Sequence, residues 1–191
     1  METAAFEARE KRFPLTRTYV MGILNMTPDS FSDGGKFLNP ERAVNRALEM
    51  ERDGADIIDI GGQSTRPGYT AVSPEEEWAR IQAVVPAVVR ETGLAVSVDT
   101  FYPWVAEKAL EAGVQIINDV SGFGDEMLQA VAVSGCGCIV MHPRGAQHGD
   151  ILREVKSFFE ERLRAAECFG VGKSRLCFDP GVGFGKTYED N

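Results

Sequence analysis

The sequence predicts an α/β protein: a parallel TIM or (β/α)8 barrel of which about six of the eight strand–helix units are present. Apolar runs rich in Val, Ile and Leu alternate regularly with helical runs, as expected for parallel strands that are covered by helices. Almost every expected strand also ends in a polar residue. We assign residues 18–191 to the partial barrel and residues 1–17 to a charged N-terminal lead-in.

Start and stop residues mark the expected helices. Asn39 and Ser73 are typical N-cap residues, each followed by a proline, while Gly54 and Gly93 follow the ends of the first two helices. We expect helices at residues 40–53, 74–92, 103–113, 126–133 and 151–169. We expect strands at residues 18–24, 55–62, 95–99, 114–120, 136–142 and 175–179.

The polar residues at the strand ends favour a barrel over an open doubly wound sheet. In a barrel, the carboxyl ends of all strands meet at one mouth, whereas an open sheet uses mainly those near its switch point. The polar strand ends are Asn25, Asp59, Asp99, Asn118, His142 and Asp179. Because a complete barrel needs about 250 residues, two strand–helix units are expected to be missing beyond Asn191.

Composition excludes several functions. The net charge of −9 argues against a nucleic-acid partner, which would require a basic face. No run approaches the roughly 20 apolar residues of a membrane span, and the N-terminus lacks the apolar core of a secretory signal. We therefore expect the cytoplasm as the compartment. The four cysteines lack zinc-site spacing, so we expect small buried side chains, which is consistent with a reducing compartment.

Four segments together resemble the dihydropteroate synthase family. They are residues 22–35 (GILNMTPDSFSDGG), 59–68 (DIGGQSTRPG), 97–100 with 117–122 (SVDT, INDVSG) and 179–187 (DPGVGFGKT). They occur in order, and the resemblance runs from about Thr18 to Asn191. It implies a TIM barrel that condenses 6-hydroxymethyl-7,8-dihydropterin diphosphate with p-aminobenzoate and releases pyrophosphate with the help of Mg²⁺.

The resemblance assigns the pterin to Asp99, Asn118 and Asp179. A pterin presents adjacent N–H donors on one edge, which a carboxylate accepts in parallel, and an amide suits a mixed edge of donors and acceptors. The alternative for any one strand-end Asp is a helix cap or an Asx-turn.

The resemblance also implies catalytic and metal-binding residues. Asn25 corresponds to the contact with Mg²⁺ or diphosphate, and an amide oxygen is a hard ligand of the kind Mg²⁺ accepts. Asp33, Arg66 and Asp99 are the expected catalytic residues. Asp33 would stabilise the positive charge that develops on the pterin methylene as pyrophosphate departs.

Two long Gly/Pro-rich loops are expected to cover the mouth, since loops of this length are more often functional than idle. The resemblance assigns Phe31, Thr65, Pro67 and Phe184 to p-aminobenzoate, whose ring needs apolar walls. Gln63 stands where the family more often has Glu, so a charge is lost at that position. His142 is interpreted as a structural hydrogen-bonding residue.

Two alternatives remain open. One is a methyltetrahydrofolate–corrinoid methyltransferase on the same barrel, for which the STRPG and TPDSFSDGG segments would be unexpected. The other is an inactive pterin-binding fragment. In the family, the seventh strand carries a Ser-Arg-Lys segment and the eighth strand carries an Arg-x-His segment. Lys186 is not expected to replace either segment. A full-length member is expected to be a homodimer that binds small molecules, without nucleic acid or membrane partners.

Overall fold

The computed structural model describes residues 3–27, 40–64, 70–143 and 149–191. The predicted loop residues Phe31, Asp33, Thr65, Arg66 and Pro67 lie outside these ranges. No helix in the described ranges has both the length and the apolar character that a membrane span requires.

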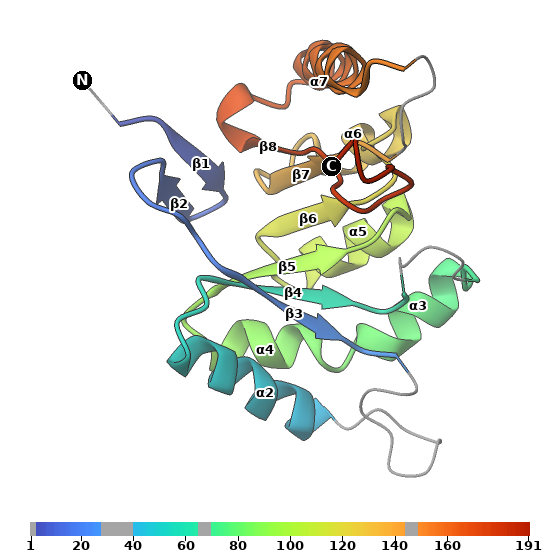
Figure 1. The fold of residues 1–191 in the computed structure, drawn as a ribbon. Coiled ribbons are helices and arrows are strands. Elements are labelled where there is room, and N and C mark those ends of the chain that lie inside the picture. The colour runs from blue at the N-terminus through green and yellow to red at the C-terminus, as the bar shows by residue number, and fades with distance from the viewer. Residues whose placement is uncertain (1–2, 28–39, 65–69, 144–148) are drawn as a thin grey trace.

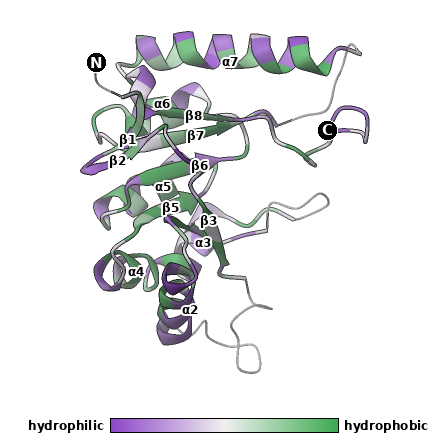
Figure 2. Ribbon diagram, turned by 60° about the vertical axis from the view of Figure 1, so that its left-hand side comes forward, coloured by the Kyte–Doolittle hydropathy of each residue, from purple (hydrophilic) through white to green (hydrophobic). Residues whose placement is uncertain are grey.

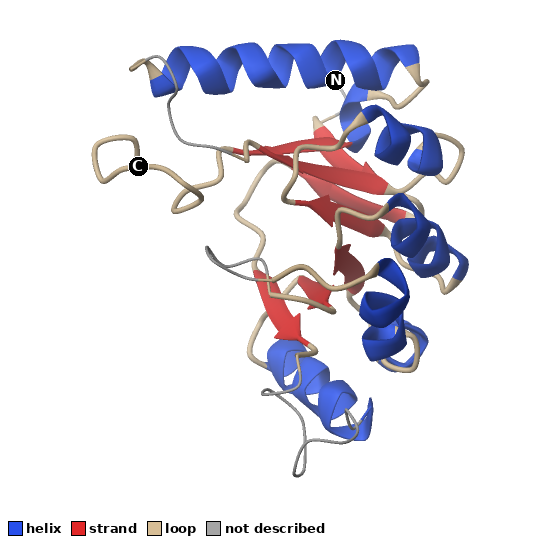
Figure 3. Cartoon of the chain, turned by 90° about the vertical axis from the view of Figure 1, so that its right-hand side faces the viewer, coloured by secondary structure: helices blue, strands red, loops and turns tan. Residues whose placement is uncertain are grey.

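The central element is a parallel sheet of six strands whose spatial order follows the sequence. An order without a switch point is that of a barrel wall, which confirms the predicted fold class. The helices lie along one side of the curved sheet and leave its other side facing the barrel interior (Figures 1 and 3). The strands are β3 (Met21–Asn25), β4 (Ile57–Gly61), β5 (Ala95–Asp99), β6 (Ile116–Asp119), β7 (Gly137–Met141) and β8 (Leu176–Asp179).

The helices bury their apolar faces against the strands and expose their polar faces (Figure 2). In α2, for example, Ala43 and Ala47 are buried one turn apart, while Arg46 between them is exposed. Their bounds are α2 (Pro40–Arg52), α3 (Pro74–Ile81), α4 (Val85–Glu91), α5 (Pro103–Glu111), α6 (Asp125–Val131) and α7 (Ile151–Cys168), with a short 3₁₀ helix, η1 (Lys173–Arg175), before β8.

The prediction of one continuous helix over residues 74–92 was wrong. The chain forms α3 and α4 with a turn between them, in which Val84 N donates to Ile81 O rather than to the carbonyl four residues back. Pro86 explains the break, because it lacks an N–H and its ring clashes with the carbonyl of the preceding helical turn. The proline at the second position of α4 is compatible with a new helix start.

The N-terminal segment forms a hairpin rather than the simple lead-in expected from its charged composition. Strands β1 (Ala5–Ala8) and β2 (Lys11–Pro14) pair antiparallel and lie at the end of the sheet where the parallel strands begin (Figure 1). The buried hairpin residues Ala8 and Phe13 pack with the first inward-facing residues of three strands, Ile57, Ala95 and Ile116. The hairpin therefore closes the floor of the barrel interior with apolar side chains.

Polar contacts fix the hairpin to the loops below the strands. At its tip, Arg9 N donates to Gly135 O (2.8 Å), and the Arg9 guanidinium donates to Leu110 O (3.0 Å). Gln115 Nε2 donates to Glu10 Oε1 (3.0 Å). These bonds join residues about a hundred positions apart, so the hairpin adds long-range connections that the parallel sheet alone lacks.

The cysteines fit the expectation only in part. All four are free; Cys136 and Cys138 are buried, as expected, but Cys168 and Cys177 are exposed. Cys168 ends α7, and Cys177 belongs to β8, the last strand of the described sheet. The expectation of a buried side chain was therefore wrong for these two residues.

The hairpin floor gives a stability prediction. Phe13→Ala removes a ring that packs edge-to-face on Tyr19 at 5.1 Å between centroids, and is expected to lower the free energy of unfolding by about 3 kcal/mol. Leu15→Ala, at an exposed position of the same segment, should change it by less than about 0.5 kcal/mol. Urea denaturation of both variants is the measurement, and equal losses would contradict the role assigned to the floor.

Candidate active site

Strand register brings the polar side chains of neighbouring strands together on the inner face of the sheet. Asp59 of β4 pairs with Ser97 of β5, and Asp99 of β5 pairs with both Gly61 and Asn118. The residues of opposite parity belong to the core beneath the helices: Ile58, Ile60, Val96 and Val98. Because side chains alternate between the two faces of a strand, the polar set lies inside the barrel.

A hydrogen bond between two strands organises this inner face. Asn118 Nδ2 donates to Asp59 Oδ2 over 3.0 Å. Asp59 is 4% exposed, and burial raises its pKa, while the neighbouring Ser97 and Asn118 side chains oppose the rise. Its other oxygen, Oδ1, is buried with no hydrogen-bond partner among the described residues. Such an oxygen can accept a bond from a ligand or a water molecule.

Asp59 and Ser97 are functional-site candidates outside the site predicted from the sequence. Asp59 is one of the predicted polar strand ends and Ser97 lies in the SVDT segment, but neither belongs to the predicted site. The structure places both between the apolar floor and Asp99, two residues before Gly61 and Asp99 on their strands. Side chains two residues apart on a strand point to the same face, so the spacing of Asp59 from Gly61 and of Ser97 from Asp99 could have identified them.

Asn25 and Asp99 flank Gly61, which leaves room for both. A Cβ placed on Gly61 would lie 3.2 Å from Asn25 Oδ1 and 3.8 Å from Asp99 Cβ. Asn25 pairs with Gly61 in the register of β3 and β4. The structure thus brings four side chains into one group, the polar rim: Asn25, Asp59, Asp99 and Asn118.

Asp179 lies on the same rim but one strand further away. The strand β7 separates it from Asn118, and Met141 of β7 is its register partner. Asp179 Oδ1 accepts a bond from Gly181 N at 2.7 Å, which is the Asx-turn considered as the alternative role for a strand-end Asp.

The loop after β8 folds back over the ends of β7 and β8. Lys186 Nζ donates to the carbonyl oxygens of Gly181 (2.9 Å) and His142 (3.2 Å). Burial lowers the pKa of Lys186, and Asp179 and Asp190 oppose this shift. The half-buried Phe184 belongs to this loop, and its N–H donates to Gly181 O. Lys186 is therefore engaged in holding its own loop.

His142 and Asp119 have structural surroundings. The buried His142 ring packs edge-to-face on Phe158 of α7 at 5.1 Å. Asp119 follows Asn118 but accepts bonds from Ser121 N (2.6 Å) and Phe123 N (2.9 Å), which shape the turn after β6. Of two adjacent polar residues, the first thus faces the barrel interior and the second stabilises the chain reversal.

Glu77 is a buried acid outside the barrel interior. It lies on α3, is 0% exposed, and accepts a bond from Thr100 Oγ1 at 2.9 Å. Burial raises the pKa of Glu77 from the ordinary 4.5 to about 7, and the Thr100, Gln63 and Arg80 side chains oppose the shift.

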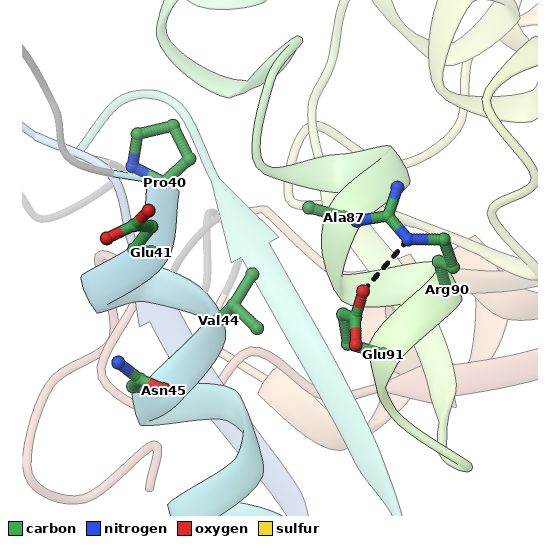
Figure 4. A pocket seen from close by; sticks show the side chains of 7 residues that line it. All are labelled: Pro40, Glu41, Val44, Asn45, Ala87, Arg90 and Glu91. Carbon is green, nitrogen blue, oxygen red and sulfur yellow. Dashed lines mark hydrogen bonds and ion pairs between the residues drawn. The ribbon is translucent and has the colours of Figure 1, made fainter.

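A groove of about 430 Å³ lies between α2 and α4 (Figure 4). The described residues that line it all belong to these two helices: Pro40, Glu41, Val44, Asn45, Ala87, Arg90 and Glu91. None of the predicted site residues within the described ranges lines this groove. The polar rim, rather than the groove, is therefore the candidate active site.

No group of three or more His, Cys, Asp or Glu side chains suited to a metal ion occurs in the parts of the chain that the structure describes. An Asn amide oxygen is a different kind of ligand, and Asn25 is exposed at the rim beside Asp99. One such oxygen is compatible with Mg²⁺, which keeps several waters and binds substrate phosphates.

A wall of parallel strands with an apolar floor and a polar rim at the strand ends defines a ligand-binding protein of the TIM-barrel class. The comparisons with known proteins identify the family. Residues 21–191 match the family model described as pterin binding enzyme. This chain therefore belongs to the pterin binding enzyme family.

The relatives with assigned names are similar to this chain over most of its length. A dihydropteroate synthase of Clostridium beijerinckii is 46% identical over 92% of this chain and 66% of that protein. One of Bacillus subtilis is 44% identical over 92% of this chain and 62% of that protein. The chain thus spans less than two thirds of the length of these relatives.

Solved structures of dihydropteroate synthases are also similar to this chain. A dihydropteroate synthase of Xanthomonas albilineans in complex with 7,8-dihydropteroate has a TM-score of 0.86 and 41% identity, over 98% of this chain and 69% of that chain. One of Yersinia pestis, solved with a sulfonamide drug complex, has a TM-score of 0.88 and 39% identity, over 98% of this chain and 71% of that one.

The bond between Asn118 and Asp59 predicts a pH-dependent loss of stability. Asn118→Ala removes the donor and leaves a buried acid, so the free energy of unfolding should fall by about 2 kcal/mol near pH 7. The loss should grow as the pH rises, because the pKa of Asp59 rises further without its donor. Asn45→Ala, exposed on α2, is the matched control. A loss that is equal at pH 5 and pH 9 would argue against this bond.

Glu77 gives a second pH prediction. Its folded-state pKa lies above the unfolded-state value, so its contribution to stability is complete below about pH 4.5 and is lost as the pH rises through about 7. Glu77→Gln should therefore reduce the fall in unfolding free energy between pH 4.5 and pH 8 by about 3 kcal/mol. Denaturant titrations at each pH test this. The exposed Glu75→Gln should keep the wild-type profile, and an unchanged profile for Glu77→Gln would contradict the prediction.

Proposed function

We propose that this chain is part of a dihydropteroate synthase, which joins 6-hydroxymethyl-7,8-dihydropterin diphosphate to p-aminobenzoate and releases pyrophosphate. The observation that carries the proposal is the register of β4, β5 and β6, which sets Asp59, Asp99 and Asn118 side by side at the mouth of the barrel. The names of the relatives and the pteroate compounds bound by solved relatives support it.

The rim suits the edge of a pterin. Asn118 donates through Nδ2 to Asp59, so its carbonyl oxygen Oδ1 would serve a ligand as an acceptor. The Asp99 carboxylate accepts adjacent N–H groups in parallel, and Asp179, with Oδ1 held in its turn, offers Oδ2. A flat heterocycle that is rich in N–H donors is the ligand that such a set of acceptors binds best.

The reaction exchanges one bond at the pterin methylene. The C–O bond to the diphosphate breaks, the amino nitrogen of p-aminobenzoate forms the new C–N bond, and that nitrogen loses a proton. The catalytic roles of Asp33, Arg66 and Asp99 are proposed from the family resemblance. Asp33 would stabilise positive charge on the methylene as pyrophosphate leaves, an interaction that is strongest in the transition state.

Asn25 would hold Mg²⁺ by its amide oxygen at the rim, next to Asp99. When bound, the ion supplies positive charge that neutralises the diphosphate. The p-aminobenzoate ring would lie against Phe31, Pro67 and Phe184, with Thr65 nearby. We further propose that the complete protein is a cytoplasmic homodimer.

The direct test is turnover by the complete protein. We expect incorporation of labelled p-aminobenzoate into dihydropteroate when pterin diphosphate and Mg²⁺ are present. The alternative enzyme on this barrel would instead transfer a methyl group from methyltetrahydrofolate to cobalamin. Methyl transfer without p-aminobenzoate incorporation would refute the proposal.

Substitution of the proposed pterin carboxylate should weaken turnover strongly. Asp99→Asn replaces an acceptor of two N–H bonds by an amide, and kcat/KM for the pterin diphosphate should fall about 100-fold, since bonds to charged groups each contribute about 1.5–3 kcal/mol. Asp53→Asn, at an exposed position just after α2, is the control and should remain active. A ten-fold or smaller loss for Asp99→Asn would remove Asp99 from pterin binding.

A further inference from the structure

Glu77 has surroundings that helix packing does not explain. It is fully buried, whereas its neighbours Glu75 and Glu76 on the same turn of α3 are exposed. Glu77 Oε2 accepts a bond from Thr100, but Oε1 is buried without a hydrogen-bond partner in the described ranges. Because a buried carboxylate costs several kcal/mol unless it is well bonded, an apolar residue would satisfy packing alone at lower cost.

Thr100 connects Glu77 to the rim. It follows Asp99 directly, and its hydroxyl donates to Glu77 while accepting a bond from Tyr102 N at 3.1 Å. Its backbone N–H donates to Asn118 O at 2.9 Å. One threonine thus ties the end of β5 to the end of β6 and to α3.

Gln63 connects Glu77 to the segment that follows β4. Gln63 is 2% exposed, and its Oε1 accepts a bond from Val72 N at 3.4 Å. Its amide is close enough to Glu77 to lower the pKa of that acid, although Gln63 Nε2 and Glu77 Oε1 do not meet the geometry of a hydrogen bond. Tyr102 also donates its hydroxyl to Val72 O at 2.7 Å. The two described ends of the β4–α3 connection therefore meet at the same cluster.

The backbone of α3 packs closely against Gly62, the residue that follows β4. A Cβ on Gly62 would lie 2.8 Å from both Glu77 Cγ and Glu77 O. Arg80 Nη1, one turn further along α3, donates to Gly62 O at 2.9 Å. A shift of the Glu77 side chain therefore displaces the strand ends, because no empty space between α3 and Gly62 can accommodate it.

We infer that Glu77 is a positioning residue for pterin binding: through its bond to Thr100, it fixes the end of β5 so that Asp99 is presented to the ligand. This role rests on the proposed function. An apolar residue at position 77 fills the same space but leaves the Thr100 hydroxyl without its acceptor. The segment after Asp99 then loses its hydrogen bond to α3, and the carboxylate is presented less accurately.

The experiment compares variants of the complete protein by steady-state kinetics. Glu77→Leu should raise KM for the pterin diphosphate about ten-fold with kcat within about two-fold, because binding is lost equally in the ground state and the transition state. Glu77→Gln keeps an oxygen that accepts from Thr100 and should restore KM to within about three-fold of wild type. Thr100→Val should reproduce Glu77→Leu, and the double variant should be no worse than either single variant. Glu75→Leu is the matched control on the exposed side of the same turn.

The outcomes distinguish a failure of the positioning role of Glu77 from a failure of the proposed function. A purely structural role predicts lower unfolding stability of Glu77→Leu with unchanged KM, and that result overturns the inference. Should Glu77→Leu fail to fold, Thr100→Val decides, because its KM must rise if the connection matters. If wild type turns over while KM is unchanged in both variants, only the positioning role fails. If the wild-type protein does not incorporate p-aminobenzoate, both the proposed function and the positioning role are overturned.

Discussion

The register of neighbouring parallel strands is the constraint on which the candidate site depends. Alternate side chains of each strand face the barrel interior, so the pairing of Asp59 with Ser97 and of Asp99 with Asn118 sets polar groups beside one another. A slip of one residue would turn Ile58 and Val98 inward and expose the acids to the helix layer. The apolar residues beneath the helices oppose such a slip, and so the same side chains that stabilise the core also align the site.

The interior is layered along its axis. The hairpin and the first inward residues of the strands form a dry floor, and the polar rim begins above it. Groups that lie next to such a floor are poorly hydrated, so each hydrogen bond they make is stronger and each unmade bond costs more. This explains why Asp59 has a raised pKa and why the Asn118 amide is oriented by it. The floor and the rim are thus two parts of one arrangement.

Much of this arrangement could be predicted from the sequence. Continuous Val, Ile and Leu runs located all six strands of the sheet, because they follow from local periodicity. Most of the polar residues predicted at the strand ends lie at the rim, whereas His142 packs on α7. The hairpin at residues 5–14 was missed because short strands of mixed charge carry no periodic signal, and its stabilising contacts, such as that of Arg9 with Leu110, are distant in sequence. The break between α3 and α4 was missed although Pro86 marks it. The burial of Glu77 was missed because one acid in a run of three looks like part of a solvated helix start.

The most direct test of the central claim is a crystal structure of the complete protein with 6-hydroxymethylpterin bound. We expect the nitrogen-rich edge of the pterin to contact Asp99, Asn118 and Asp179 above an unchanged bond between Asn118 and Asp59. A pterin that is bound elsewhere, for example in the groove between α2 and α4, with no contact to these three side chains, would contradict it.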